Sequence, residues 1–112
     1  MIAQTLYLSG PVTGMPDRNE KSFHQAQFML EKMGYDVINP LQVVADPETG
    51  HDEAMKLCLS SMADADGVCL LEGWESSAGA MQEYAEARRR RIEAKGLFDW
   101  IADRKAIASK GW

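Results

Sequence analysis

Two small residues and a carboxylate lie close together in the second half of the chain. The stretch LEGWESSAGAMQEYAEA, residues 71–87, leaves an apolar run, passes two serines and enters a helix-forming segment. Ser77 and Gly79 stand where that helix would begin, and the free N–H groups of a helix start favour phosphate or carboxylate. Glu83 follows Gly79 by four residues, so the two share a helix face and the glycine leaves space above the carboxylate. This spacing predicts an anion cradle beside a carboxylate that can act as a nucleophile.

Each of these residues also has an ordinary structural interpretation. Serine is a preferred helix cap, so Ser77 can simply close the helix start while Gly79 allows close packing. Glu83 can face water, as most charged side chains do. Tyr7, in an early apolar run, suits a protein core, although a phenol at the end of a strand can also hydrogen-bond a carboxylate. Taken one at a time, the residues leave both interpretations open.

Four further titratable residues are weaker candidates for catalysis or metal binding. Asp64 and Asp66 flank the start of an apolar run, and paired carboxylates can divide acid and base work. The alternative is that they close one helix and open the following turn. His24 and His51 lie far apart with no partner spacing that indicates a metal site or a catalytic triad, so we expect both at the surface.

The composition bounds the class of protein. The chain has 112 residues, 46% of them hydrophobic, which is enough for one domain with a core that needs no disulfide or structural metal. A net charge of −5 disfavours a protein that coats nucleic acid. Cys58 and Cys69 show no metal-ligand spacing and are expected to be reduced, buried thiols. The sequence shows neither a signal peptide nor a long apolar run, so we expect a cytoplasmic protein without membrane contact.

Strand-like and helix-like segments alternate along the chain. Periodicity and turn residues predict strands at 5–9, 35–39, 67–71 and 97–101, and helices at 20–33, 52–63 and 77–94. Residues 102–112 fit either a short helix or a docking tail. This order predicts an α/β fold over residues 1–112: an open parallel sheet of about four strands with helices on both faces, flavodoxin-like or Rossmann-like.

Ligands of such sheets bind beyond the carboxyl ends of the strands, where the strand order reverses. The loop after the first strand, SGPVTGMPDRN, and the loop after the third, EGWESSAG, would be neighbours there. The basic run at residues 88–91 surrounds a helix end, and we expect it to be solvated, with Glu86 paired to Arg90. A subunit contact is the next interpretation of this run, and nucleic acid the last.

Three stretches together resemble the nucleoside 2-deoxyribosyltransferase family, especially its small bacterial and phage branch. They are YLSGPVTGMPDRN, FHQAQFMLEKMGYDVINP and ADADGVCLLEGWESSAGAMQEYAEA, and the resemblance covers residues 5 to about 95. It implies an N-deoxyribosyl transferase or hydrolase that cleaves the N-glycosidic bond of a deoxynucleoside or its monophosphate. By the resemblance, Glu83 would be the nucleophile that forms a covalent intermediate, and Tyr7 would orient it. Ser77 and Gly79 would lie near the sugar 5′ end.

The loop residues expected to bind substrate with Ser77 and Gly79 are Ser9, Gly10, Asn19 and Trp74. The resemblance implies no metal and no organic cofactor. It also implies a homo-oligomer, a dimer or higher, because family members complete their pockets with residues from a neighbouring chain.

One position departs from the family pattern. Family members have an aspartate eight residues before the aspartate that opens the third strand, and this chain has Cys58 there, counted back from Asp66. A thiol supplies no negative charge at neutral pH unless its pKa is depressed. The alternative is therefore a non-catalytic nucleotide-binding or sensing protein that retains the pocket. A third interpretation is an interaction module that uses the arginine run and the C-terminal tail.

Overall fold

The computed structural model describes residues 4–110, with side chains up to residue 106. Strands and helices alternate along it, joined by short 3-10 turns. The strands are β1 (Thr5–Ser9), β2 (Asp36–Ile38), β3 (Gly67–Leu70) and β4 (Glu93–Gly96). The helices are α1 (Glu20–Lys32), α2 (Pro40–Val43), α3 (His51–Ser61), α4 (Ala78–Arg89) and α5 (Leu97–Lys110), and the turns are η1 (Pro16–Asn19), η2 (Met62–Asp64) and η3 (Trp74–Ser76).

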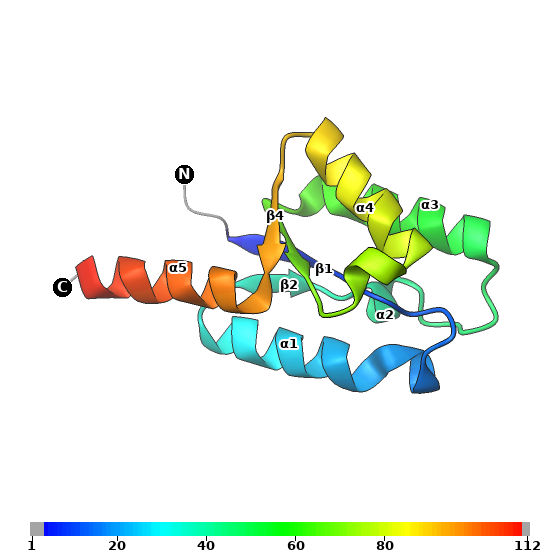
Figure 1. Cartoon of the computed structure of the whole chain (residues 1–112), viewed down its shortest axis with the longest axis horizontal. Helices are drawn as coiled ribbons and strands as arrows, with labels where there is room; N and C mark the ends of the chain where they lie inside the picture. The colour runs from blue at the N-terminus through cyan, green and yellow to red at the C-terminus, as the bar shows by residue number, and fades with distance from the viewer. Residues whose placement is uncertain (1–3, 111–112) are drawn as a thin grey trace.

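The strands form a four-stranded, all-parallel sheet in the order β2-β1-β3-β4. Helices α1 and α5 cover one face of this sheet, and α3 and α4 cover the other (Figure 1). The predicted α/β fold, an open parallel sheet of Rossmann-like type with helices on both faces, is confirmed. Because β1 and β3 are neighbours, the loops that follow them leave the sheet side by side.

Alternation along β1 decides which side chains meet which helix layer. Leu6 and Leu8 pack into the cluster that contains α1 and α5 residues, whereas Tyr7 packs into the cluster that contains α3 and α4 residues. Side chains two apart in a strand share a face, so Ser9 points the same way as Tyr7. The strand therefore presents two hydroxyl groups to the layer that holds α4.

The first half of the chain follows its sequence pattern closely. In α1, Phe23, Ala26 and Leu30 are buried at three- and four-residue steps, and Gly34 follows the helix with a φ of +93°. The second strand is shorter than the predicted 35–39, because Asn39 instead caps α2 by accepting a hydrogen bond from the Leu41 N–H. The prediction had no helix here.

The last third of the chain corrects two predictions. The helix predicted at 77–94 ends at Arg89, because Arg91 has a φ of +59° and the chain turns into β4. The strand predicted at 97–101 is wrong, since these residues begin α5. Trp100 of α5 is 2% exposed, packs against the sheet and donates its indole N–H to the Val68 carbonyl oxygen. Residues 102–110 continue this helix, and residues 111–112 of the expected tail lie outside the described residues.

The other titratable residues singled out in the sequence stabilise the fold, are buried as thiols or lie at the surface. The Asp66 carboxylate accepts hydrogen bonds from the N–H groups of Gln4 and Thr5 and so fixes the start of β1. Both histidines are exposed, and both cysteines are free and buried. At the end of α4, Glu86 pairs with Arg90, as predicted, and also with Arg89.

No helix within residues 4–110 is both long enough and apolar enough to span a membrane.

Candidate functional site

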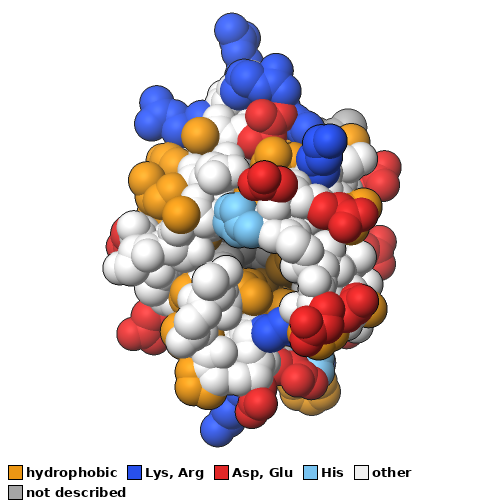
Figure 2. Space-filling model, turned by 90° about the vertical axis from the view of Figure 1, so that its right-hand side faces the viewer, with side chains coloured by type: hydrophobic (Ala, Val, Ile, Leu, Met, Phe, Trp, Pro, Cys, Tyr) orange, Lys and Arg blue, Asp and Glu red, His pale blue; other side chains and the backbone are white. Residues whose placement is uncertain are grey.

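A cavity of about 690 Å³ opens at the carboxyl ends of the central strands. Its walls come from the loop after β1, from α2 and α3, and from the start of α4. Figure 2 shows the hollow in the middle of this face, with hydrophobic side chains visible inside it. Such a volume suits a small organic ligand, because ligand pockets commonly measure about 300–1,000 Å³.

Glu83 lies in the wall of this cavity and is only 5% exposed. Its Oε2 accepts a hydrogen bond from the Tyr7 hydroxyl, and its Oε1 accepts one of 2.7 Å from the Ser9 hydroxyl. These are the two hydroxyl groups that β1 directs toward α4. A carboxylate oxygen has two lone pairs, so each oxygen retains acceptor capacity toward the cavity. The interpretation of Glu83 as a solvated helix residue does not hold.

Burial and hydrogen bonding shift the pKa of this carboxyl group in opposite directions. Burial raises the pKa of Glu83 to about 7, although the hydrogen bonds from Tyr7 and Ser9 lower the pKa. Burial also raises the pKa of Tyr7, so this phenol keeps its proton and stays a donor at neutral pH. Glu83 is therefore divided between its neutral and ionised forms near pH 7, where its carboxylate can serve as a base or a nucleophile.

The start of α4 adjoins this carboxylate. Ser77 caps the helix, because its Oγ accepts a hydrogen bond of 3.2 Å from the Ala80 N–H. Ala78 and Gly79, the first two residues of the helix, line the cavity. A Cβ built on Gly79 would lie 3.4 Å from the Met55 Sδ, so the α3 methionine partly fills the space expected above the carboxylate. A helix start in this position favours an anionic group.

The remaining predicted residues divide into two groups. Gly10 lines the cavity, and a Cβ there would lie 2.9 Å from the Leu71 Cβ, so the two adjacent loops require a glycine at their contact. Trp74, Asn19 and the fully buried Ser9 are not among the described residues that line the cavity. The Trp74 ring packs on Tyr84 with centroids 4.8 Å apart, and the Asn19 side-chain amide donates to the Pro11 carbonyl oxygen.

Residues 4–95, from just before β1 into β4, match the family described as Domain of unknown function (DUF4406). The chain belongs to that family. No curated protein and no solved structure gave a match.

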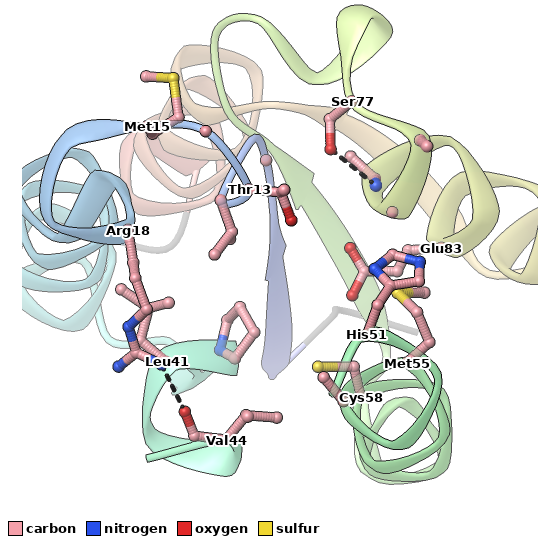
Figure 3. A pocket seen from close by; sticks show the side chains of 18 of the residues that line it. Thr13, Met15, Arg18, Leu41, Val44, His51, Met55, Cys58, Ser77 and Glu83 are labelled. Atoms are coloured by element: carbon pink, nitrogen blue, oxygen red, sulfur yellow. Dashed lines mark hydrogen bonds between the residues drawn. The ribbon is translucent and has the colours of Figure 1, made fainter. Parts of the chain in front are cut away.

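One cavity residue of this DUF4406 chain carries chemistry that its sequence position alone did not reveal. Arg18 lies on the wall across from Glu83 (Figure 3), and its Nη1 donates a hydrogen bond of 2.8 Å to the Val44 carbonyl oxygen. Asp17, Arg18 and Asn19 have φ values of 49°, 56° and 59°, and although Asp and Asn adopt left-handed φ values more often than other residues, three in a row are unusual.

Cys58, which stands where the resembled family has an aspartate, also lines the cavity. It lies on the face of α3 that lines the cavity with His51 and Met55, at spacings of three and four residues. Burial raises its pKa, so Cys58 is a neutral thiol that faces Glu83 and Tyr7. Within the described residues, no group of three histidine, cysteine or acidic side chains is arranged to hold a metal ion.

Proposed function

We propose that this DUF4406 protein cleaves the N-glycosidic bond of a deoxynucleoside or deoxynucleoside monophosphate, as an N-deoxyribosyl hydrolase or transferase with Glu83 as nucleophile. The observation that carries the proposal is one carboxyl group, 5% exposed, in a cavity wall with hydroxyl donors on both oxygens. The resemblance to nucleoside 2-deoxyribosyltransferases, given by the motifs around Tyr7 and Glu83, supplies the substrate class.

The chemistry requires a carboxylate aimed at the anomeric carbon. A Glu83 oxygen attacks C1′, the C1′–N bond breaks, and the base departs with the electron pair of that bond. Water then attacks C1′, its hydroxyl stays on the sugar, its proton balances the departed base, and the carboxylate is regenerated. A second base in place of water gives transfer. Tyr7 and Ser9 hold the carboxylate in one orientation throughout.

The start of α4 would hold the 5′ end of the sugar. Ser77 and Gly79 line the cavity on the side where the helix begins, and a phosphate there meets free N–H groups and the positive end of the helix dipole. With its 5′ end at the start of α4, the substrate would place its sugar beside Glu83.

Chromatographic detection of free base tests this function. We expect wild-type protein, incubated with each deoxynucleoside and each monophosphate, to release base, and Glu83→Gln to lose that release. Glu86→Gln is the matched control, because Glu86 lies one turn further along α4 and pairs with arginines. A wild-type protein that releases no base from any of these compounds would remove the proposal, as would a Glu83→Gln variant with wild-type rates.

Tyr7→Phe gives a second readout with the nucleophile in place. The Tyr7 hydrogen bond lowers the pKa of Glu83, so its removal leaves a carboxyl group that ionises at higher pH. We expect base release to fall by roughly 10- to 100-fold at neutral pH, the usual effect of a lost hydrogen bond to a charged group. The rise of activity with pH should also move to higher pH. An unchanged pH profile would show that Tyr7 does not act on the nucleophile.

A non-catalytic nucleotide sensor is the second candidate, and Cys58 is the observation that favours it. Its raised pKa makes this group neutral where the resembled family has a carboxylate. Nucleotide binding in calorimetry without base release supports the sensor, and base release that appears only in Cys58→Asp would indicate a lost activity.

Self-association and a cytoplasmic location belong to the same proposal. Leu57 of α3 and Met81 of α4 are 43% and 44% exposed, and these helices also form the cavity walls. A neighbouring chain packed over them would bury apolar surface and complete the pocket. Two free, buried cysteines fit a reducing compartment.

A further inference from the structure

Arg18 is the one arginine or lysine among the described residues that line the cavity. Its guanidinium is partly buried and is held at the end of α2 by the hydrogen bond from Nη1 to the Val44 carbonyl oxygen. A guanidinium carries five N–H donors in a planar fork. This bond fixes the position of the guanidinium and occupies one donor, which leaves other donors of the fork for a ligand.

The backbone that carries Arg18 is strained. Three consecutive residues, Asp17, Arg18 and Asn19, have left-handed φ values although none is glycine. Such conformations cost energy, and they persist where the surroundings hold them, often at binding sites. Here the Asn19 amide ties one end of the turn to the Pro11 carbonyl oxygen, and Arg18, at the centre of the turn, is bonded to the end of α2. The loop is held in the form that brings the guanidinium to the cavity.

The position of Arg18 relative to Glu83 indicates which part of a substrate it would meet. With C1′ at Glu83 and the sugar 5′ end at the start of α4, the base extends toward the opposite wall, where Figure 3 places Arg18. Leu41 and Val44 of the α2 region line that part of the wall and can pack against a flat ring, and Asp46 and Thr49 of the loop that follows α2 are polar lining residues.

We infer that Arg18 reads the far edge of the base, and that the cavity prefers a 6-oxopurine, guanine or hypoxanthine, over adenine. This inference rests on the proposed function. O6 and N7 of a 6-oxopurine are two adjacent acceptors that match a guanidinium fork, and this pairing is the most common specific contact between arginine and a base. Adenine presents an N6 amino donor in place of O6, so it would oppose one donor with another.

Binding to the Glu83→Gln variant tests the inference without consumption of the ligand. We expect calorimetry to show dGMP and dIMP bound roughly tenfold or more tightly than dAMP, in line with the discrimination of one bidentate pair. Adding Arg18→Gln should abolish this preference, and adding Arg18→Lys should also weaken it, because lysine keeps the charge but lacks the fork. Thermal melting of each variant checks that it is folded.

Deoxyguanosine and Asp17→Gly serve as controls. If Arg18 bound the 5′ phosphate, Arg18→Gln would remove the difference between dGMP and deoxyguanosine and leave the base preference unchanged, which would overturn the inference. Asp17→Gly, an exposed position in the same turn, relieves a left-handed φ and should retain the preference.

The remaining outcomes separate the two proposals. Equal binding of dGMP, dIMP and dAMP by Glu83→Gln with Arg18 intact overturns the role of Arg18 and leaves the proposed function standing. Absence of binding to every nucleotide, together with absence of base release by the wild-type protein, overturns both.

Discussion

The carboxyl group of Glu83 links the chemistry of the site to the stability of the fold. Its pKa is raised to about 7 by burial, whereas an ordinary glutamate has a pKa near 4.5. As the pH rises from 4.5 to 7, the unfolded chain gives up this proton before the folded chain does. The free energy of unfolding should therefore fall over this window, by about 3 kcal/mol from this one group.

Urea unfolding of wild-type protein and Glu83→Gln between pH 4 and pH 8 checks this linkage. The variant has no ionisable group here, so we expect its stability to rise relative to wild type by about 3 kcal/mol across the range. Glu86→Gln should be less stable than wild type, since hydrogen bonds from Arg89 and Arg90 stabilise the Glu86 carboxylate and lower its pKa to about 2. Its relative loss of stability should be full and constant above pH 4.5 and begin to fade only at the acid end of this range. Parallel curves for wild type and Glu83→Gln would contradict a desolvated carboxyl group.

The sequence predicted part of the site because those residues sit at fixed spacings on regular elements. Ser77, Gly79 and Glu83 follow helical geometry, and Tyr7 and Ser9 alternate along a strand, so the fold determines where they point. Arg18 could not be found in this way. Its position depends on three left-handed residues whose conformation is held by contacts with Pro11 and Val44.

At the scale of elements, the contact between β3 and α5 depends on the absence of a side chain. A Cβ built on Gly67 would lie 2.5 Å from the Cη2 atom of Trp100 and 2.7 Å from its Cζ2. The indole ring thus packs directly on the strand backbone, close to its hydrogen bond with the Val68 carbonyl oxygen. This glycine allows α5 to cover its face of the sheet.

We expect Gly67→Ala to lower the free energy of unfolding by about 1–3 kcal/mol, the usual cost of an overpacked core. Gly50→Ala is the matched control, because Gly50 has a φ of −62° and a Cβ there meets no atom within 4 Å. Its effect should stay within about 0.5 kcal/mol. Chemical denaturation of both variants measures the difference, and equal stabilities would show that Trp100 can shift without cost.

The elements that the sequence predicted well carry their own start and stop signals. Helix α1 has an apolar stripe and Gly34 after it, whereas α4 ends before Arg91, a left-handed residue that gives no such signal. The edge strand β4, with the sequence EAKG, is polar and is defined by its pairing with β3. The segment 97–101 was misassigned because Leu97, Trp100 and Ile101 fit a helical stripe as well as an apolar strand.

At the scale of the whole molecule, the strand order brings distant parts of the sequence to one opening. Because β1 and β3 are adjacent and parallel, the loop with Gly10 meets the loop that leads into α4, and α2 and α3 close the other sides. Four separate segments thus build the cavity, although the sequence motifs lie in only two of them. The fold class was predictable from alternating elements, whereas the contribution of α2 and of residue 18 required the tertiary arrangement.

Exposed apolar side chains on the helices that wall the cavity predict where copies of the chain meet. Leu57 and Met81 are exposed on the helices that form the cavity walls, whereas Phe98, 73% exposed, lies on α5 in the opposite layer. If a neighbouring chain completes the pocket, it must pack over α3 and α4. We therefore expect light scattering after gel filtration to give at least a dimer mass, which Leu57→Ser or Met81→Ser should lower toward a monomer and Phe98→Ser should leave unchanged. A wild-type monomer at all concentrations would contradict self-association, and dissociation by Phe98→Ser alone would place the interface away from the cavity.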